Sequence, residues 1–488
     1  MEWVIANMAP LMFGALVLFL LFGYPVAFAL AANGIVFGLL GIELGLLTPA
    51  LFQALPERIF GIMANDTLLA IPFFTFMGLV LERSGMAEDL LDTIGQLFGP
   101  MRGGLAYAVI FVGALLAATT GVVAASVISM GLISLPIMLR YGYDKRLASG
   151  VIAASGTLAQ IIPPSLVLII MADQLGRSVG DMYEGAMIPG LVLTSLYVGY
   201  VVVLSIFKPA TCPALPPEAR TLRGLKLMLR VLTTLVPPLV LIFLVLGTIF
   251  LGIATPTEGG AMGAAGALIL ALARKRISWS LLQQAMATTG KLSSFVVFIL
   301  VGSTVFGLVF RGVNGDLWVE HLLLSLPGGQ LGFLIVVNIL VFVLAFFLDF
   351  FELSFIIVPL LAPVADKLGI DLVWFGVLLA VNMQTSFMHP PFGFALFYLR
   401  SVAPASVKTT DIYWGAIPFV CIQIIMVAII LIFPNIVSYG DPAERARIEQ
   451  AGEAGGVDLG SLMQDSDSGK QDEPNADLLK NLQSNEAK

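Results

Sequence analysis

Two stretches, Gln160-Ile161-Ile162-Pro163-Pro164-Ser165 and Ser386-Phe387-Met388-His389-Pro390-Pro391, each place a diproline inside an apolar run of membrane-spanning length. A proline inside a helix removes a backbone donor and clashes with the preceding turn, at a cost of about 3 kcal/mol. In lipid the freed carbonyl groups need other partners, so a broken helix persists only where it lines a protein cavity. Two such breaks, at matching places in two halves of a chain, indicate the binding site of a membrane transporter.

The two halves of the chain are related in sequence. The diprolines are 227 residues apart (390 − 163), and other prolines, glycines and aspartates repeat at the same offset. Beyond the diprolines the offset becomes 230, which a three-residue insertion explains. This ordered set predicts an internal duplication. The matching pairs are Pro136 with Pro363, Gly142 with Gly369, Asp144 with Asp371, and 181–186 with 411–416.

The composition predicts an all-α polytopic membrane protein. Of 488 residues, 58% are hydrophobic and 12% are charged, whereas a soluble domain carries roughly 25% charged residues. The first apolar run follows Met1-Glu2-Trp3 without a basic flank, so we expect a retained helix rather than a signal peptide. The two cysteines indicate neither a disulfide framework nor a metal site. No G-x-x-x-x-G-K-S/T loop occurs, so we do not expect the chain to hydrolyse ATP.

Four clusters of basic residues indicate which loops face the cytoplasm. With these clusters inside, the chain threads as two inverted repeats of about five transmembrane helices, each with one re-entrant hairpin, at 104–139 and 331–365. This threading places the N-terminus and the acidic tail on the periplasmic side. Two full crossings in place of each hairpin would give the same sidedness, so that alternative stays open. We expect helices near 4–22, 25–43, 66–83, 147–171, 183–207, 231–254, 257–273, 290–310, 372–398 and 411–436, with amphipathic arms at 86–100 and 278–289.

The tips of the hairpins and the residues before the diprolines supply the candidate ion ligands. A carboxylate at membrane depth costs roughly 2.5–3.5 kcal/mol and is a functional candidate by default, and Asp349 stands at the second tip. Hydroxyls, amides and freed carbonyls are hard donors, and with few carboxylates they suit Na⁺ better than a transition metal. As alternatives, the hydroxyls could bond their own backbone, and Asp349 could form a salt bridge to the scaffold. The predicted Na⁺ ligands are Thr119, Thr120, Gly121, Ser155, Gly156, Thr157, Asp349, Gln384, Thr385 and Ser386.

Each diproline also begins a new half-helix, whose N-terminal N–H groups can face an anionic substrate. His389 could carry a proton, or it could be a hydrogen-bonding filler. Asp144 and Asp371 stand at helix starts and are expected to be N-caps. The predicted substrate-binding residues are Pro163, Pro164, Ser165, His389, Pro390 and Pro391.

The run 384–398 (Gln-Thr-Ser-Phe-Met-His-Pro-Pro-Phe-Gly-Phe-Ala-Leu-Phe-Tyr) resembles the large membrane subunit of tripartite ATP-independent periplasmic (TRAP) transporters. The run 161–165, the pair Thr120-Gly121 and the pair Pro189-Gly190 resemble it too, and the resemblance covers nearly all of 4–437. His389 stands where the family usually has a small or hydroxyl residue, and the first tip is poorer in serine than usual. The run 399–404 resembles the branch that handles 2-oxo or hydroxy monocarboxylates.

The resemblance implies Na⁺-driven import of a small organic acid across the bacterial inner membrane by an elevator-type fold. It implies two partners, a small membrane subunit and a periplasmic substrate-binding protein, and neither a nucleic acid nor a cofactor beyond the coupling ion. A self-sufficient Na⁺/anion symporter of the same fold is the alternative, and an intramembrane enzyme built on Asp349, Glu352 and His389 is a weaker one. The expected parts are a scaffold at 1–85 and 231–312, a transport domain at 86–207 and 313–436, a cytoplasmic linker at 208–230 and an acidic disordered tail at 437–488.

Overall fold

A computed structural model describes residues 2–120 and 123–440 of the chain. In these two ranges every regular element is a helix, which confirms the all-α prediction. Six helices are long and apolar enough to cross a membrane, or up to eight if each of two bent pairs counts as one span. The chain is therefore a multi-pass membrane protein. The acidic tail beyond Gly440 lies outside the described residues.

The first half follows the predicted order of helices, with one addition. A short 3-10 turn and α4 precede α5, to which they are bent by 46°; they were not predicted, because 49–63 is short and carries two prolines. The arm predicted at 86–100 is present as α6, which begins after Gly85 at φ 73°. The helices are α1 (Glu2–Ala6), α2 (Met8–Leu21), α3 (Val26–Glu43), α4 (Leu55–Met63), α5 (Asp66–Arg83), α6 (Met86–Phe98), α7 (Gly104–Thr120), α8 (Val123–Arg140), α9 (Lys145–Thr157), α10 (Leu166–Leu175) and α11 (Val179–Phe207).

The second half corrects one prediction. The separate arm expected at 278–289 is wrong, because these residues form the start of a continuous helix, α14, which Ser278 caps. Leu281 and Ala285 are buried on the same face as Val296, so nothing in the packing breaks the helix between them. The helices are α12 (Gly224–Phe250), α13 (Pro256–Ala273), α14 (Trp279–Gly312), α15 (Gly315–Leu324), α16 (Gly329–Leu344), α17 (Phe350–Ile356), α18 (Val358–Lys367), α19 (Leu372–Gln384), α20 (Phe394–Val402) and α21 (Thr409–Ile432).

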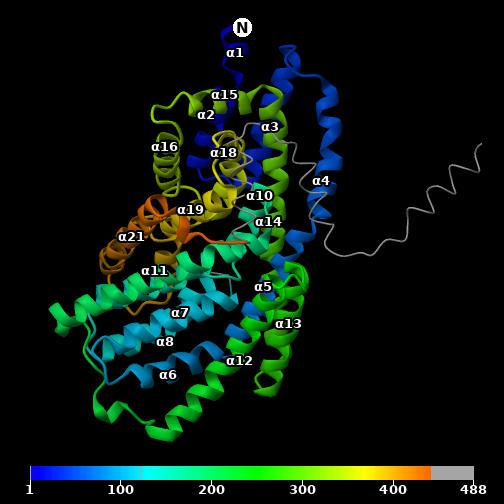
Figure 1. Cartoon of the computed structure of the whole chain (residues 1–488). Helices are drawn as coiled ribbons and strands as arrows, with labels where there is room; N and C mark the ends of the chain where they lie inside the picture. The colour runs from blue at the N-terminus through cyan, green and yellow to red at the C-terminus, as the bar shows by residue number, and fades with distance from the viewer. Residues whose placement is uncertain (1, 121–122, 441–488) are drawn as a thin grey trace, which may run out of the picture. The chain divides into compact units, whose positions relative to one another are not determined.

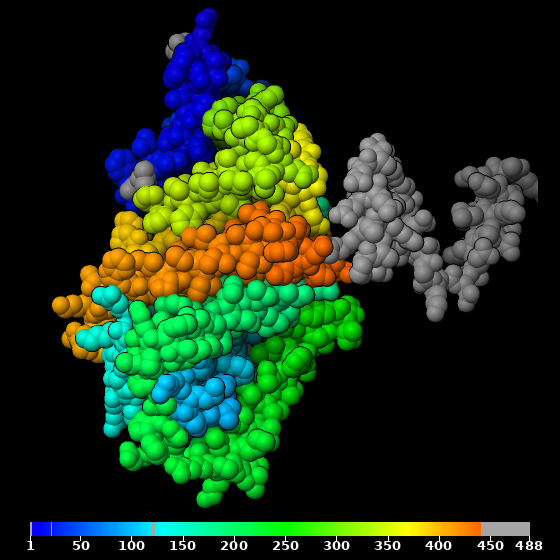
Figure 2. All heavy atoms as spheres, turned by 60° about the vertical axis from the view of Figure 1, so that its left-hand side comes forward, coloured from blue at the N-terminus to red at the C-terminus, as the bar shows by residue number. Residues whose placement is uncertain are grey.

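Helices of the two halves pack against each other in matching pairs. α3 packs on α14, α5 on α13, and α9 on α21. The contact between α9 and α21 is a direct backbone approach, because a β-carbon at Gly150 or Gly415 would overlap the facing main chain. In Figure 2 the orange band that contains α21 crosses the face between the yellow-green segment of α16 and the teal segment of α11. Segments far apart in sequence therefore build one core.

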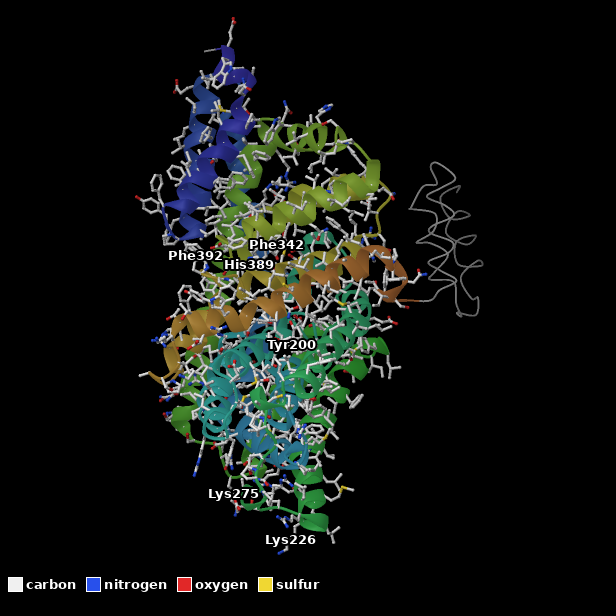
Figure 3. All side chains as sticks on the ribbon, turned by 90° about the vertical axis from the view of Figure 1, so that its left-hand side faces the viewer. Tyr200, Lys226, Lys275, Phe342, His389 and Phe392 are labelled. Atoms are coloured by element: carbon white, nitrogen blue, oxygen red, sulfur yellow. The ribbon has the colours of Figure 1, made fainter. Side chains whose placement is uncertain are left out.

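Two lysines mark one end of residues 2–439. Lys226, near the start of α12, and Lys275, in the loop after α13, lie together at this end (Figure 3). The N-terminal helices and α15 lie at the opposite end (Figures 1 and 3). Lys226 and Lys275 therefore lie at the end of the protein opposite to the N-terminal helices.

Candidate functional site

The predicted helix breaks are present at both diprolines. In the first half α9 ends at Thr157, a 3-10 turn covers Leu158–Gln160, and α10 begins at Leu166. In the second half α19 ends at Gln384, a 3-10 turn covers Thr385–Phe387, and α20 begins at Phe394. Both diprolines contain a cis peptide bond. The two interruptions are thus built from the same sequence of local elements.

Residues that correspond in the two halves touch each other between the breaks. The Gln384 side chain donates from Nε2 to Thr157 Oγ1 over 3.1 Å, and these positions are 227 residues apart (384 − 157). Both side chains are fully buried. Two residues that correspond in a repeat touch each other only close to the axis that relates the two repeats. The C-terminal ends of α9 and α19 therefore meet close to that axis.

The helices that enter the breaks begin in the same way. Asp144 accepts hydrogen bonds from the backbone of Arg146 and Leu147, and Asp371 accepts one from Trp374. These observations confirm the predicted N-caps. The glycines that precede the caps, Gly142 and Gly369, both have positive φ, 83° and 70°, which a glycine adopts without strain. The duplication is therefore visible in backbone geometry as well as in sequence.

Several buried oxygen atoms near the breaks have no hydrogen-bond partner among the described residues. They are Ser155 Oγ, Gln160 Oε1, Gln384 Oε1 and Ser386 Oγ, on side chains that are at most 3% exposed. A buried polar atom without a partner costs about 1–3 kcal/mol, so each is an acceptor ready for a cation or water. Three of the four were predicted ion ligands.

The other predicted ion ligands divide into three groups. Thr157 and Thr385 donate to the carbonyl groups of Ala154 and Asn382, at 2.8 and 2.6 Å, which is the self-bonding alternative. Gly156 lets α8 approach closely, because a β-carbon there would overlap Val127. The side chains of Thr119 and Thr120, and all of Gly121, lie outside the described residues. The prediction for that first tip stays untested.

Asp349 has a structural role that was not predicted. It is the N-cap of α17 and accepts a hydrogen bond from Glu352 N, while the Glu352 carboxylate accepts one from Asp349 N, both over 2.9 Å. Among the described residues neither carboxylate forms an ion pair, so the scaffold salt bridge considered above is not seen. One turn further, Ser354 Oγ lies 3.6 Å from the sulfur of Met171 in α10 and 3.8 Å from that of Met383 in α19. The second tip therefore packs between the helices that flank both breaks.

The two breaks differ in how their second half-helix begins. At the first break Ser165 caps α10 through Val167 N and Leu168 N and donates to Gln160 O over 2.6 Å. At the second break the N-cap of α20 is Gly393, which has no side chain to cap the helix, and Pro391 is exposed. Of the predicted substrate-binding residues, those of the first break are buried. The N-terminus of α20 therefore lacks the side-chain cap that α10 has.

His389 fills a space between aromatic rings. It is 1% exposed and lies 4.2 Å from Phe346 and 4.4 Å from Phe342, measured between ring centroids. Figure 3 shows it beside Phe342 and close to Phe392. Within the described residues neither ring nitrogen makes a hydrogen bond, although the Ala345 carbonyl lies near the ring. The structure thus shows aromatic packing rather than the hydrogen-bonding filler that was considered.

A buried amide near the second break, Asn338, was not predicted. Asn382 donates from Nδ2 to the carbonyl and the side-chain oxygen of Asn338, at 2.8 and 2.9 Å. This link joins α19 to α16. An amide inside an apolar, membrane-length helix is the signal that could have identified Asn338 from the sequence.

Comparisons with known proteins agree on one family. A family model described as "Tripartite ATP-independent periplasmic transporter, DctM component" matches residues 13–436. The chain is 30% identical over 392 residues to the C4-dicarboxylate TRAP transporter large permease protein DctM of Pseudomonas aeruginosa, covering 80% of this chain and 90% of the relative. It is also 30% identical over 434 residues to the protein of that description from Vibrio cholerae, covering 84% and 92%.

A more distant relative and a solved structure extend the comparison. The Sialic acid TRAP transporter permease protein SiaT of Haemophilus influenzae is 27% identical over 393 residues, which are 79% of this chain and 62% of that protein. The crystal structure of the Alcanivorax borkumensis YdaH transporter has a TM-score of 0.53 at 15% identity, covering 79% of this chain and 88% of that one. This last likeness shows the fold alone.

Proposed function

This chain belongs to the DctM family of tripartite ATP-independent periplasmic transporters and is a large permease subunit rather than an enzyme; from that premise, we propose that it couples the import of a small organic acid to a Na⁺ gradient. The observation that carries the proposal is the set of buried, unpartnered oxygen atoms of Ser155, Gln160, Gln384 and Ser386. Hydroxyl and amide oxygens are hard, neutral donors, and such donors suit a monovalent hard cation. Gly156 contributes through its backbone. The hydroxyl groups of Thr157 and Thr385 already donate to the carbonyl groups of Ala154 and Asn382, so their contacts to the ion are weaker.

We propose an elevator mechanism with two inverted repeats. The direct contact between Thr157 and Gln384, the paired N-caps and the paired positive-φ glycines support a symmetric arrangement of the halves. The moving domain would comprise 86–207 and 313–436, as the sequence suggests. In this mechanism the Na⁺ ligands of both breaks move together, because Gln384 of α19 bonds Thr157 of α9, and α17, which Asp349 caps, packs on α10 and α19.

The substrate anion would bind at the second break. The N-terminal N–H groups of α20 have no side-chain cap, and a helix N-terminus favours a negative charge by about 0.3–1 kcal/mol at an exposed site. The first break offers no such opening, because Ser165 already caps α10. The relatives are named for C4-dicarboxylates and sialic acid, which share a carboxylate. The sequence resemblance to monocarboxylate carriers leaves the number of carboxylates open.

We propose that the chain works in the bacterial inner membrane with a small membrane subunit and a periplasmic binding protein. The end with Lys226 and Lys275 would face the cytoplasm and the end with the N-terminus the periplasm, as the distribution of basic loops favours. A self-sufficient symporter is the competing reading. Uptake by the purified chain alone in liposomes, without either partner, would favour that reading.

The test is Na⁺-dependent uptake in proteoliposomes that contain the chain and its small subunit, supplied with loaded binding protein. Asp349→Ala should abolish or strongly weaken uptake, and Ser155→Ala should raise the half-saturating Na⁺ concentration about tenfold, as loss of one oxygen contact implies. Ser195→Ala is the matched control, because Ser195 bonds only its own helix at Leu191. Uptake of wild-type rate and Na⁺ dependence in both site variants would refute the proposed ion site.

A further inference from the structure

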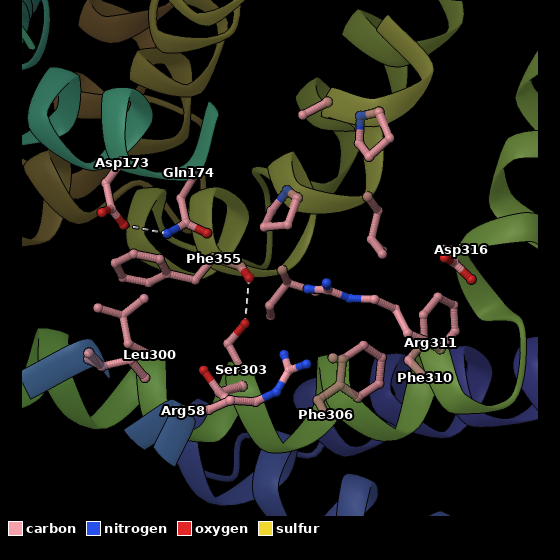
Figure 4. A pocket seen from close by; sticks show the side chains of 18 of the residues that line it. Arg58, Asp173, Gln174, Leu300, Ser303, Phe306, Phe310, Arg311, Asp316 and Phe355 are labelled. Carbon is pink, nitrogen blue, oxygen red and sulfur yellow. Dashed lines mark hydrogen bonds between the residues drawn. The ribbon is translucent and has the colours of Figure 1, made fainter. Parts of the chain in front are cut away.

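A cavity lined by polar and apolar residues lies away from both diprolines. Its volume is about 450 Å³, and it is enclosed by α4, α5, α14 and α15 on one side and by α10, α17 and α18 on the other. This volume is in the range of small-molecule sites, about 300–1,000 Å³. Arg58 of α4 and Arg311 of α14 both extend into it (Figure 4).

Neither arginine has a partner within the described residues. No hydrogen bond or ion pair links the side chain of Arg58 or Arg311 to any residue of 2–120 or 123–440, and both side chains are exposed. The nearby Asp173 forms an ion pair with neither arginine; its two oxygens accept from the side-chain amides of Asn65 at 2.6 Å and Gln174 at 2.8 Å. Asp316 lies at the edge of the cavity in Figure 4 and forms no ion pair with Arg311. A guanidinium group presents a planar fork that matches a carboxylate, and here two forks face one space.

The cavity stands between the N-terminal side of the protein and the breaks. α14 starts at Trp279, next to the basic loop with Lys275, and 34 residues carry Arg311 roughly 50 Å along the helix. Arg311, in the last turn of α14, thus lies near the end that the proposed orientation places in the periplasm. Its inner wall contains Phe355 of α17, the short helix that Asp349 caps, and Ser303 donates to the Phe355 carbonyl over 2.6 Å.

We propose that this cavity is a vestibule site, in which Arg58 and Arg311 bind a carboxylate of the organic acid before the acid reaches the second break. The direction of passage rests on the proposed function; binding of a carboxylate in the cavity does not. The cavity wall also carries Asp173 and Asp316, but neither forms an ion pair with Arg58 or Arg311, so both guanidinium groups are available to an incoming carboxylate. The apolar wall from Phe306, Phe310 and Phe355 suits the carbon skeleton of a small acid.

The direct test uses a cysteine as a reporter of occupancy. Thr304 lines the cavity and has no hydrogen bond among the described residues, so Thr304→Cys in a Cys421→Ser background places one accessible thiol there. Millimolar succinate should slow alkylation of this thiol by a maleimide in the detergent-solubilised full chain. Succinamide, which is neutral and of similar size, should not. Acetate in place of succinate shows whether one carboxylate is enough.

The arginine variants then identify the ligands. Arg58→Gln or Arg311→Gln should raise the succinate concentration needed for half-protection about tenfold, as loss of one solvent-screened charged contact implies. Arg58→Lys keeps the charge, so it should raise this concentration less than Arg58→Gln does. Arg102→Gln is the control, since it removes an exposed arginine outside the cavity. Equal melting temperatures of the four variants verify that the fold is kept.

The outcomes separate this proposal from the proposed function. If wild-type uptake is Na⁺-dependent but succinate gives no protection, or protects the arginine variants equally, the vestibule site is refuted while the transport function stands. If succinate gives no protection but the Gln variants weaken binding of the loaded binding protein, the arginines belong to a protein interface and the proposal is refuted. Protection by succinate that needs both arginines supports the site even in a chain that fails to transport.

Discussion

Removal of the Asp89 carboxylate should measurably loosen the arm α6 from its neighbours. Asp89 is 17% exposed and receives three arginines, Arg230 at 3.3 Å, Arg274 at 3.4 Å and Arg276 at 3.2 Å. These arginines come from the start of α12 and from the loop after α13, so one carboxylate joins three separate segments. Without it, three guanidinium groups remain close together with no anion among them.

The magnitude follows from exposure. Each arginine is partly solvated, at 47%, 20% and 42% exposed, so each contact contributes about 0.5–1 kcal/mol, and the repulsion left behind adds to the loss. Asp89→Ala should therefore lower the free energy of unfolding by about 2–3 kcal/mol. For a chain of this length that corresponds to roughly 2–3 °C in Tm. The assay is thermal unfolding in detergent at low ionic strength, with Asp92→Ala as control, because Asp92 is an exposed carboxylate on the same helix.

A double variant tests the reasoning about charge. Arg230→Gln alone should destabilise the chain slightly, since its described contacts are with Asp89. In the Asp89→Ala background the same change should be neutral or stabilising, because it removes repulsion between cations. Arg230→Gln effects of the same sign and size in both backgrounds, or an Asp89→Ala protein that melts like Asp92→Ala, would contradict this account.

The remaining predictions concern the two breaks and are also measured by thermal unfolding, with uptake added for the last. Thr157→Val and Gln384→Leu should each cost about 1–3 kcal/mol because each leaves a buried polar partner unpaired, and the double variant should cost less than their sum; strict additivity would deny the contact. Ser165→Ala should lower the free energy of unfolding by about 1 kcal/mol, because α10 loses its N-cap. The control Ser178→Ala, at the exposed start of α11, should lower it less. Equal losses in the two variants would count against a special role for the buried cap. His389→Phe should raise Tm, because it removes two unpartnered nitrogens from an aromatic setting, while uptake falls if His389 touches the substrate; wild-type uptake would leave it a packing residue.

The features that the sequence predicts correctly are those with a local chemical cause. A diproline interrupts a helix wherever it stands, and an aspartate after a glycine turn caps one, so both breaks and the caps Asp144 and Asp371 could be predicted without knowledge of packing. The capping box at Asp349 also has a local signature, an acidic residue followed three positions later by Glu352. A carboxylate at membrane depth is also typical of an ion ligand, so the local signature alone does not separate the two roles.

The features that the sequence does not predict depend on distant contacts. Arg58 and Arg311 are 253 residues apart (311 − 58), and nothing near either one indicates that they share a cavity. The continuity of α14 likewise depends on what covers Leu281 and Ala285, since a leucine-rich amphipathic stretch can end as a separate arm or continue a long helix. Local composition cannot decide between these outcomes.

The duplication and its imperfections have different consequences for function. The shared frame, with caps, breaks and the contact between Thr157 and Gln384, brings oxygen atoms of both halves together, as a small cation requires. By the same offset of 227, however, Ser165 corresponds to Phe392 and Ile162 to His389, and these differences leave α10 capped and enclosed but α20 uncapped and open. In the proposed function a cation therefore binds to oxygen atoms of both halves, whereas the anion binds at the second break. We infer that the symmetric positions set the ion dependence of this protein, and that the positions where symmetry fails set which acid it carries.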